Sequence, residues 1–425
     1  MFERPDAGER AILVHLNLQV GQEDLDELKE LTKSAGAQPI HTVCGSRHRP
    51  DPKYFVGLGK LDEIKAAVAE HQADIIIVNH PLSPSQERNL EKALETRVVD
   101  RNGLILDIFA QRAQTFEGKL QVELAQLKHL STRLIRGWTH LERQKGGIGL
   151  RGPGETQLET DRRLLGVRIK QIQQRLQKVE KQRHQGRSKR KKAEIPTVSL
   201  VGYTNAGKST LFNTLTGAGI YAADQLFATL DPTLRHLPID QNAEVILADT
   251  VGFIRHLPHE LVAAFRSTLQ EASEADLLLH VIDADAPDRE DTILEVNRVL
   301  QDIGAGSIAQ LRIYNKIDLL EEVAPRIDFD ANGRPVAVWI SAQTGLGVDL
   351  LLQALKQCFC DSKVIRKCFL PASQAGLKAK WFGQVRFLEE KIDDFGACEL
   401  TIEIDKKNLG LLKDVRAEEV LALPG

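Results

Sequence analysis

The clearest chemical pattern in the chain is a glycine-rich stretch at residues 202–209, which reads GYTNAGKS. Gly202, Gly207, Lys208 and Ser209 have the spacing G-x-x-x-x-G-K-[ST], between a β-branched stretch and residues with helical periodicity. Glycines let backbone N–H groups approach phosphate oxygens, and a helix N-terminus adds donors and a favourable dipole. The lysine is then placed to neutralise the β- and γ-phosphates, and the hydroxyl to bind Mg²⁺. The predicted phosphate-binding loop comprises Gly202, Tyr203, Thr204, Asn205, Ala206, Gly207, Lys208 and Ser209.

Two further motifs follow at intervals typical of a nucleotide-dependent switch. DTVG comes directly after the strand-like stretch 243–248, so its carboxylate is expected to reach Mg²⁺ through water and its glycine N–H to contact the γ-phosphate. Before it lies FATLDPT, in which Thr229 is predicted to close on Mg²⁺ and the γ-phosphate, with Thr233 as the competing candidate. The predicted contacts are Phe227, Ala228, Thr229, Leu230, Asp231, Asp249, Thr250, Val251 and Gly252. We predict catalytic roles for Lys208, Thr229 and Gly252, and metal ligation by Ser209 and Thr229.

The sequence NKID at residues 315–318 predicts which base the nucleotide carries. A carboxylate that accepts from both guanine N1–H and N2–H₂ is satisfied by guanine, whereas adenine presents no such pair of donors. The sequence SAQ, after the strand-like stretch 336–340, is expected to supply a backbone contact to guanine O6. The predicted base contacts are Asn315, Lys316, Ile317, Asp318, Ser341, Ala342 and Gln343. Four motifs in this order predict an enzyme that binds and hydrolyses GTP with Mg²⁺.

Length and periodicity predict a multidomain α/β protein around this site. The 425 residues exceed the roughly 250 to 300 residues of a single core. Strand-like and helix-like segments alternate through the first hundred residues, which predicts a parallel sheet with crossover helices; His80, Asp100 and Asp107 there are assigned no role. We expect an N-terminal α/β domain at 1–110, a helical hairpin at 111–193, a P-loop GTPase domain with a mixed, mostly parallel sheet at 194–362, and a small α+β domain at 363–425.

The expected hairpin consists of two amphipathic segments with a glycine-rich break between them. Apolar residues recur at spacings of three and four at 120–141 and 158–179, which predicts two long helices packed antiparallel. Residues 168–192 contain eleven Lys or Arg and one acid, a pattern that suits contact with RNA as well as a solvated face. The break at 146–155 is interpreted as a finger toward nucleic acid or a flexible hinge. Its G-x-G-x-x-G spacing follows a helix, so we reject a dinucleotide site.

Whole-chain properties exclude several other classes of protein. The net charge is −3 and the pI near 6.5, so any nucleic-acid affinity must come from local patches, and nothing in the sequence favours DNA. The sequence has no apolar run of about 18 residues and no signal-peptide pattern, and its five cysteines lack paired C-x-x-C spacing. We expect a reduced, cytoplasmic monomer, in which Cys358, Cys360 and Cys368 are buried thiols and Trp381 is a core residue.

The motifs together resemble a known family. VGYTNAGKST, LFATLDPT, DTVGFI, NKID and SA resemble the translation-factor-related GTPases, and GGIGLRGPGETQLETDRR with PSQERNLE resembles the HflX family of ribosome-associated GTPases over nearly the whole chain. This resemblance implies a GTPase that binds the large ribosomal subunit and its rRNA and splits stalled or idle ribosomes. Two alternatives remain open: an Obg-like ribosome-assembly GTPase, and an RNA-binding or RNA-remodelling protein, with ATP as a second nucleotide, that the G domain only regulates.

One group expected of a GTP-hydrolysing site is missing. Ras-like GTPases use a glutamine after the D-x-x-G glycine to orient the attacking water, whereas this chain has Phe253 there. A partner surface such as rRNA, or a monovalent cation, has to supply the missing group. Asn205 stands where similar, potassium-activated relatives use an asparagine to coordinate the ion. K⁺ is therefore a candidate cofactor in addition to Mg²⁺.

Overall fold

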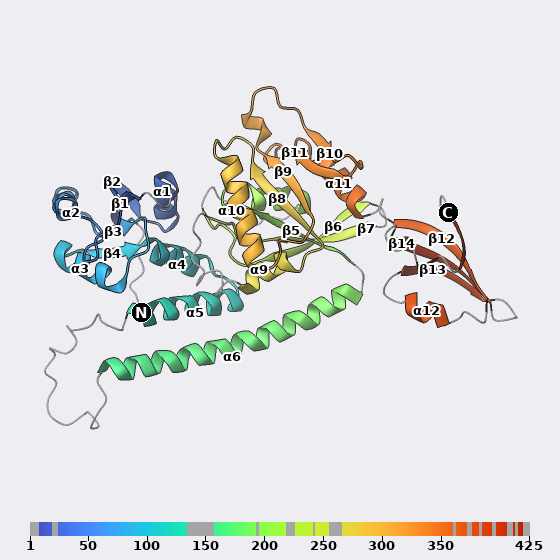
Figure 1. Ribbon diagram of the computed structural model, residues 1–425, viewed down its shortest axis with the longest axis horizontal. Coiled ribbons are helices and arrows are strands. Elements are labelled where there is room, and N and C mark those ends of the chain that lie inside the picture. The colour runs from blue at the N-terminus through green and yellow to red at the C-terminus, as the bar shows by residue number, and fades with distance from the viewer. Residues whose placement is uncertain are drawn as a thin grey trace.

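The described part of the chain folds around three separate β-sheets, seen in a computed structural model with the helices that surround them (Figure 1). In the residues that the structure describes, sheets of four, seven and four strands follow one another along the chain. Among the described helices, none is long and apolar enough to cross a membrane. The structure describes residues 8–18, 24–133, 157–192, 195–217, 226–240, 243–254, 266–359, 363–371, 376–381, 385–392, 397–405, 411–412 and 415–419.

The first sheet is entirely parallel, with the strand order β2-β1-β3-β4. Strand β3 reads IIIV and is buried throughout, as expected of a parallel strand with helices on both faces. Ser83 and Gln86 form a capping box that starts α3, and the carboxylate of Asp100 accepts from Gly103 N–H to start α4. The predicted alternation of strands and helices is confirmed. The bounds are β1 Arg10–Leu18, α1 Leu25–Ser34, β2 Gln38–Arg47, α2 Leu58–His71, β3 Ile75–Val78, α3 Pro84–Leu94 and β4 Arg97–Asp100.

Helix α4 (Arg101–Arg112) has no counterpart among the elements expected from sequence. A helix at the surface of a domain has an apolar stripe on one side, and that periodicity is what a sequence reveals. The apolar residues of α4 are buried in nearly consecutive order, because the helix packs against β3 and β4 of the first sheet, against α1 and α5 (Phe116–Arg133), and through Phe109 against Phe227. The helix therefore lies at a junction inside the molecule, where no simple stripe is required.

The predicted antiparallel hairpin is confirmed for helices α5 (Phe116–Arg133) and α6 (Gln157–Lys192). Leu120 and Leu124 form a small apolar cluster with Ile172, and Glu123 accepts from Arg168 Nη2 at 2.6 Å. Because a later residue of α5 meets an earlier residue of α6, the two helices run in opposite directions. The glycine-rich break at 146–155 lies outside the described residues.

Helix α6 extends well beyond its partner, below the first two sheets in the view of Figure 1. Its buried side is narrow, since Ile172 is fully buried while most neighbouring positions are exposed or half-buried. Lys170, Arg175, Lys178 and Lys181 are all exposed. The described part of α6 therefore presents a basic face to solvent, as its composition predicted.

The second sheet has the strand order β10-β11-β9-β8-β5-β7-β6. Only its outermost strands, β10 and β6, run antiparallel to their neighbours, which confirms the predicted mixed, mostly parallel sheet. The phosphate-loop sequence follows β5, at the carboxyl end of a central parallel strand, where α/β sheets place their ligands. The bounds are β5 Thr197–Gly202, α7 Lys208–Thr216, β6 Thr233–Asp240, β7 Ala243–Asp249, α9 Arg266–Ser273, β8 Leu277–Asp283, α10 Arg289–Asp302, β9 Gln310–Asn315, η2 Ile317–Leu319, β10 Arg326–Phe329, β11 Pro335–Trp339 and α11 Val348–Phe359.

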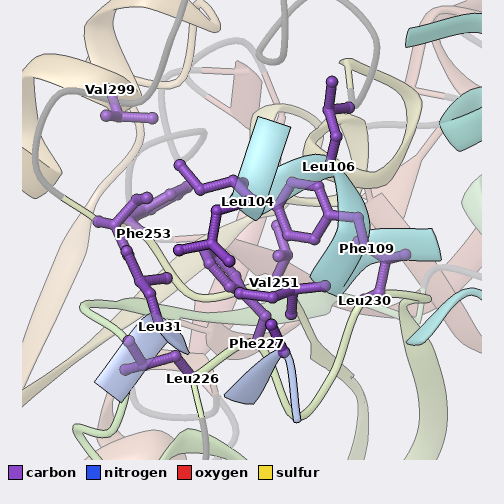
Figure 2. Packing of buried hydrophobic residues seen from close by; sticks show 14 of the residues in the cluster. Leu31, Leu104, Leu106, Phe109, Leu226, Phe227, Leu230, Val251, Phe253 and Val299 are labelled. Carbon is purple, nitrogen blue, oxygen red and sulfur yellow. The ribbon is translucent and has the colours of Figure 1, made fainter. Parts of the chain in front are cut away.

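A continuous hydrophobic core joins the first two sheets (Figure 2). The ring of Phe109 on α4 meets the ring of Phe227 edge-on, with 4.6 Å between centroids. Leu226 and Leu230 lie on either side of Phe227 in the chain and are equally buried. The segment that carries Thr229 is therefore anchored in a core shared with α4. Other members of this core labelled in Figure 2 are Leu31, Leu104, Leu106, Val251, Phe253 and Val299.

The third sheet is antiparallel, with the order β13-β14-β12-β15. Trp381 is 1% exposed in its core, as predicted. Burial raises the pKa of the Cys368 thiol to about 11 and also raises that of Cys358, whereas Cys360 lies outside the described residues. Strands β12 and β15 were not among the strands expected from the sequence. The bounds are β12 Lys363–Leu370, α12 Gly376–Trp381, β13 Val385–Ile392, β14 Cys398–Asp405 and β15 Arg416–Glu419.

Candidate nucleotide site

The phosphate loop needs its glycines for steric reasons that the structure makes explicit. Gly207 has φ +91°, and a Cβ atom there would lie 2.2 Å from the Asn315 amide nitrogen. Gly202 has φ +148°, and a Cβ atom there would lie 2.2 Å from the Val281 carbonyl oxygen. Neither position accepts a side chain without a rearrangement of backbone or of the base-site asparagine. The loop can therefore approach a phosphate chain with bare backbone, as its sequence predicted.

Three oxygens from three separate motifs meet beside this loop. Ser209 Oγ lies 2.8 Å from Thr229 Oγ1 and 2.9 Å from Asp249 Oδ2, and Thr229 Oγ1 lies 2.9 Å from the same carboxylate oxygen. The structure thus brings Thr229 to the serine of the phosphate loop. Thr233, the competing candidate, is instead the first residue of β6. This placement supports Thr229 as the switch threonine.

The same three side chains form a donor set suited to a hard cation. Mg²⁺ prefers oxygen ligands and is bound in nucleotide sites by one or two protein oxygens together with phosphates and waters. Asp249 is fully buried, and its Oδ1 atom has no hydrogen-bond partner within the described part of the chain. Burial raises the pKa of the Asp249 carboxyl, with hydrogen bonds from Ser209 and Thr229 opposing the shift. A hydrated cation here would satisfy that oxygen through its bound water, so the residues fit Mg²⁺.

Lys208 is buried at the start of α7, where it faces the space expected for the phosphates. Its Nζ donates to the Tyr203 carbonyl oxygen at 2.6 Å. Burial lowers the pKa of its ammonium group to about 8, and the charge of Asp249 opposes that shift. A triphosphate would supply negative charge in addition to that of Asp249, whose effect on Lys208 is outweighed by burial. The site is therefore destabilised until an anionic ligand arrives.

We expect Lys208→Met to stabilise the nucleotide-free protein while it abolishes tight GTP binding. The change removes a buried charge, whose depressed pKa corresponds to a cost on the order of 3 kcal/mol. Below pH 8 that cost is fully present in the wild type. Between about pH 8 and 10.5 the unfolded chain binds more protons than the folded chain, so wild-type stability rises with pH, and the variant should lack that rise.

Thermal unfolding of both proteins without nucleotide, at pH 7.5 and at pH 9.5, measures this difference. Lys178→Met, at an exposed position on α6, serves as the matched control and should change stability by less than about 0.5 kcal/mol. A Lys208→Met protein less stable than wild type at pH 7.5 would show that the lysine stabilises the empty site.

The base-binding motifs are held together by a buried asparagine. Asn315 donates to the Ala206 carbonyl oxygen at 2.9 Å and accepts from Ala342 N–H at 2.8 Å, so it joins the phosphate loop to the SAQ motif. Lys316 has φ +66° and pairs with Asp283 at 2.7 Å. The side chain of Asp318 is exposed, as is that of Gln343, whereas Ile317 is buried. The geometry leaves the Asp318 carboxylate accessible to a ligand.

Several of the predicted contacts are turned toward the N-terminal part of the chain. The pocket at the phosphate loop is lined by Thr204, Asn205, Gly207, Lys208, Ser209, Thr210, Phe227, Ala228, Thr229, Thr250 and Gly252. The hydroxyl of Tyr203 donates to Glu27 of α1, Leu230 is buried in the shared core, and Asp231 accepts from residues of the α4–α5 connection. Thr210 lines the pocket but was missed; it directly follows the motif serine, and that adjacency was the signal available.

A buried polar chain continues from Tyr203 into the first sheet. Glu27 pairs with Arg101 at the start of α4, and Arg101 Nη1 donates to Asn79 Oδ1 at 2.9 Å. Asn79 in turn contacts His15 Nδ1 at 3.1 Å. Glu27, Arg101, Asn79 and His15 are buried, so the charges of Glu27 and Arg101 compensate each other away from water. The phosphate loop is therefore linked to His15 within β1 and to Asn79 directly after β3.

Comparison with known proteins agrees with this geometry. Three family models match, described as GTP-binding GTPase N-terminal (residues 22–110), GTP-binding GTPase Middle Region (112–190) and 50S ribosome-binding GTPase (197–316). The GTPase HflX of Escherichia coli strain K12 is 57% identical over 406 residues, 95% of each chain. The GTPase HflX of Caldanaerobacter subterraneus subsp. tengcongensis is 48% identical over 404 residues, 94% of this chain and 92% of that one.

A solved structure described as the complex of SsGBP with GDP is 26% identical and covers 82% of this chain and 98% of its own, at a TM-score of 0.48. Identity at the level of the two HflX proteins, over nearly the full length of each, is far above what a shared fold alone produces. The order of the three matching family models also follows the order of the elements described above. The chain belongs to the HflX family and is a GTPase.

Proposed function

We propose that the GTP cycle of this protein controls its binding to the large ribosomal subunit and its rRNA, and that it splits stalled or idle ribosomes. The observation that carries the proposal is the physical link between the nucleotide site and the hairpin. Thr229 lies against the phosphate loop, and the segment around it packs on α4, which leads directly into α5. A change at the γ-phosphate can therefore be passed to the basic helix that packs on α5.

The basic face of α6 is the surface that we assign to rRNA. Lys170, Arg175, Lys178 and Lys181 are exposed along the helix, and the chain as a whole is slightly acidic. Each phosphate contact releases condensed counterions, so such binding should weaken steeply as salt increases. The family model matching residues 197–316 is described as a 50S ribosome-binding GTPase, which supports the same partner. We propose that the protein acts as a cytoplasmic monomer and does not bind DNA.

We further propose that the residues of the nucleotide site have the following roles in GTP hydrolysis. Ser209 and Thr229 would hold Mg²⁺ directly, and Asp249 through water, with Lys208 on the β- and γ-phosphates. Bound Mg²⁺ would neutralise charge on the phosphate oxygens. Asn205 lines the pocket with φ +60° and is our candidate ligand for K⁺. Asn315, Lys316, Asp318 and the 341–343 segment would select guanine.

Co-sedimentation with purified 50S subunits and with 70S ribosomes tests the proposal. We expect binding to 50S subunits with a non-hydrolysable GTP analogue, weaker binding with GDP, and conversion of 70S ribosomes to subunits only in the GTP state. Reversing three charges, as Lys170→Glu, Lys178→Glu and Lys181→Glu together, should weaken binding by about 100-fold or more at 150 mM salt.

The matched control is Arg298→Glu, an exposed position on α10 whose ion pair with Glu295 contributes less than about 1 kcal/mol. Its ribosome binding should match that of the wild type. Equal binding by the triple variant would exclude α6 as the contact surface. Equal binding in the GTP-analogue and GDP states would exclude nucleotide control.

A further inference from the structure

The carboxylate of Asp231 is bound by the residues that begin helix α5. Gln114 N–H and Thr115 N–H both donate to Asp231 Oδ2, at 2.9 and 2.8 Å. The Thr115 hydroxyl donates to Asp231 Oδ1. Three donors therefore converge on one carboxylate that comes from a segment more than one hundred residues later in the chain. Charge-assisted hydrogen bonds of this kind are among the stronger contacts in proteins.

The hydroxyl of Thr115 acts both as a hydrogen-bond donor and as an acceptor. It accepts from Gly118 N–H at 2.9 Å, which caps the first turn of α5, and its own proton points to Asp231. Gly118 matters for a second reason, because a Cβ atom there would lie 2.2 Å from Asp231 Oδ1. The first turn of α5 is therefore shaped to receive this carboxylate closely. The negative charge also lies near the positive end of the helix dipole.

Asp231 is only two residues from Thr229 in the chain. Thr229 Oγ1 contacts Ser209 Oγ and Asp249 Oδ2 on the nucleotide side, while Asp231 is held on the α5 side. Two residues span less than about 7 Å even when fully extended. The segment therefore cannot release Thr229 by a large movement and still keep the contacts of Asp231 unless α5 moves with it.

The rest of the segment is held from the same direction. Leu226 N–H donates to Ser34 Oγ at the end of α1, and the Phe227 ring packs against Phe109 of α4. Phe227 has φ +58°, an uncommon backbone conformation for a bulky residue. These contacts fix residues 226–228 from the N-terminal side, and Asp231 completes the attachment on the far side of Thr229.

We propose that Asp231 is a positioning residue that makes the closed placement of Thr229 depend on the first turn of helix α5. Closure of Thr229 on the nucleotide and docking of Asp231 on α5 then favour each other. Because such coupling is reciprocal, a partner that displaces α5 also changes the relative affinities for GTP and GDP. The inference rests on the proposed role of Thr229 toward Mg²⁺ and the γ-phosphate, and it does not require ribosome binding.

Gln114 N–H and Thr115 N–H donate to Asp231, so the rates of hydrogen exchange at these two amides report directly on the contact between Asp231 and α5. In wild-type protein without ribosomes, we expect these amides to exchange at least about tenfold more slowly with Mg²⁺ and a non-hydrolysable GTP analogue than with GDP. Asp231→Asn keeps the shape of the side chain and removes its charge. In this variant the two amides should exchange at similar rates in both nucleotide states. Equal exchange in the two nucleotide states of the wild type would overturn the proposal.

Affinity measurements supply an independent readout. Asp231→Asn should lower the ratio of GTP-analogue to GDP affinity by about fivefold or more, within the usual range of coupling between sites. Its GDP affinity should stay within about threefold of wild type. Gly118→Ala should reproduce the effect, because the added methyl group displaces Asp231 while alanine favours the helix itself. Glu290→Gln, an exposed acid on α10, should change neither quantity.

Thr229→Ala separates failure of this inference from failure of the assumption beneath it. If Thr229→Ala lowers the affinity ratio and Asp231→Asn does not, Thr229 has its proposed role and Asp231 is only a structural contact. If Thr229→Ala also leaves the ratio of GTP-analogue to GDP affinity unchanged, Thr229 is not the switch threonine. The proposed coupling through Asp231 is then wrong as well. Normal unfolding temperatures for all variants would show that the comparison concerns folded protein.

Discussion

The Asp318→Asn variant is expected to lose GTP binding and to gain binding of XTP. A carboxylate that pairs with both N1–H and N2–H₂ of guanine becomes an amide, which leaves one guanine donor facing another donor. Sites built around such hydrogen bonds discriminate by as much as 10⁴ to 10⁵, so we expect GTP affinity to fall by roughly 10³ or more. Xanthine carries a carbonyl at C2 and accepts from the new amide. Equilibrium competition between GTP and XTP measures the change.

The structure gives a reason to expect that this variant folds normally. The loop that carries Asp318 is fixed by Asn315 and by the pair of Lys316 with Asp283, while the Asp318 side chain itself is exposed. Glu321→Gln, an exposed acid three residues later, provides the control and should keep the wild-type preference. An Asp318→Asn protein that still prefers GTP to XTP would disprove the assignment of this carboxylate to the base.

Large ribosomal subunits are expected to accelerate GTP hydrolysis by on the order of 10³-fold or more. The residue after the D-x-x-G glycine is Phe253, whose side chain is 1% exposed and lies in the core shared with α4. It therefore neither orients a water molecule nor reaches the phosphates. A group supplied by a partner can restore the missing stabilisation, as an arginine finger does with effects of about 10³ to 10⁵. Single-turnover hydrolysis with and without 50S subunits measures the acceleration.

The same assay in Na⁺ and in K⁺ distinguishes the two groups that could stabilise the transition state, a bound K⁺ ion and the ribosomal partner. If Asn205 holds K⁺, hydrolysis by the isolated protein should rise in potassium, and Asn205→Ala should lose that rise while 50S stimulation persists. Asn17→Ala, outside the pocket, is a suitable control. Fast turnover in sodium without any partner would contradict the expectation, because it would mean that this chain already contains the complete catalytic set.

The link between the nucleotide site and the hairpin offers a route by which a bound ribosome would accelerate GTP hydrolysis. If a ribosome contacts α6 as proposed, it would act on α5 through their shared apolar seam, and α5 begins next to the residues that bind Asp231. The polar chain from Tyr203 through Glu27 to Arg101 ties the phosphate loop to the same N-terminal elements. The described contacts thus connect the nucleotide site to the hairpin through packed elements, without a need for a large opening of the core.

The sequence by itself determined the motifs of the nucleotide site and the class of the fold. Phosphate binding requires bare backbone at fixed intervals, so the glycines at 202 and 207 and the residues after them are constrained locally and can be read directly. Helices α5 and α6 were predictable for a similar reason, because a regular apolar seam follows from helical geometry. Strands such as β3 were recognisable because burial on both faces demands a continuous apolar run.

Only the tertiary structure decided the orientation of side chains that belong to no recognisable local sequence pattern. Phe227, Leu230 and Asp231 lie in a motif that was interpreted as nucleotide-binding. In the structure, Phe227 and Leu230 pack in the shared core, and the carboxylate of Asp231 binds the start of α5. Helix α4 was not predicted because β3, β4, α1 and α5 cover it from several sides, so that it has no one-sided apolar stripe. Strands β12 and β15 become strands through pairing within the antiparallel sheet. Each of these features depends on contacts between residues far apart in the chain, and periodicity within one segment carries no information about them.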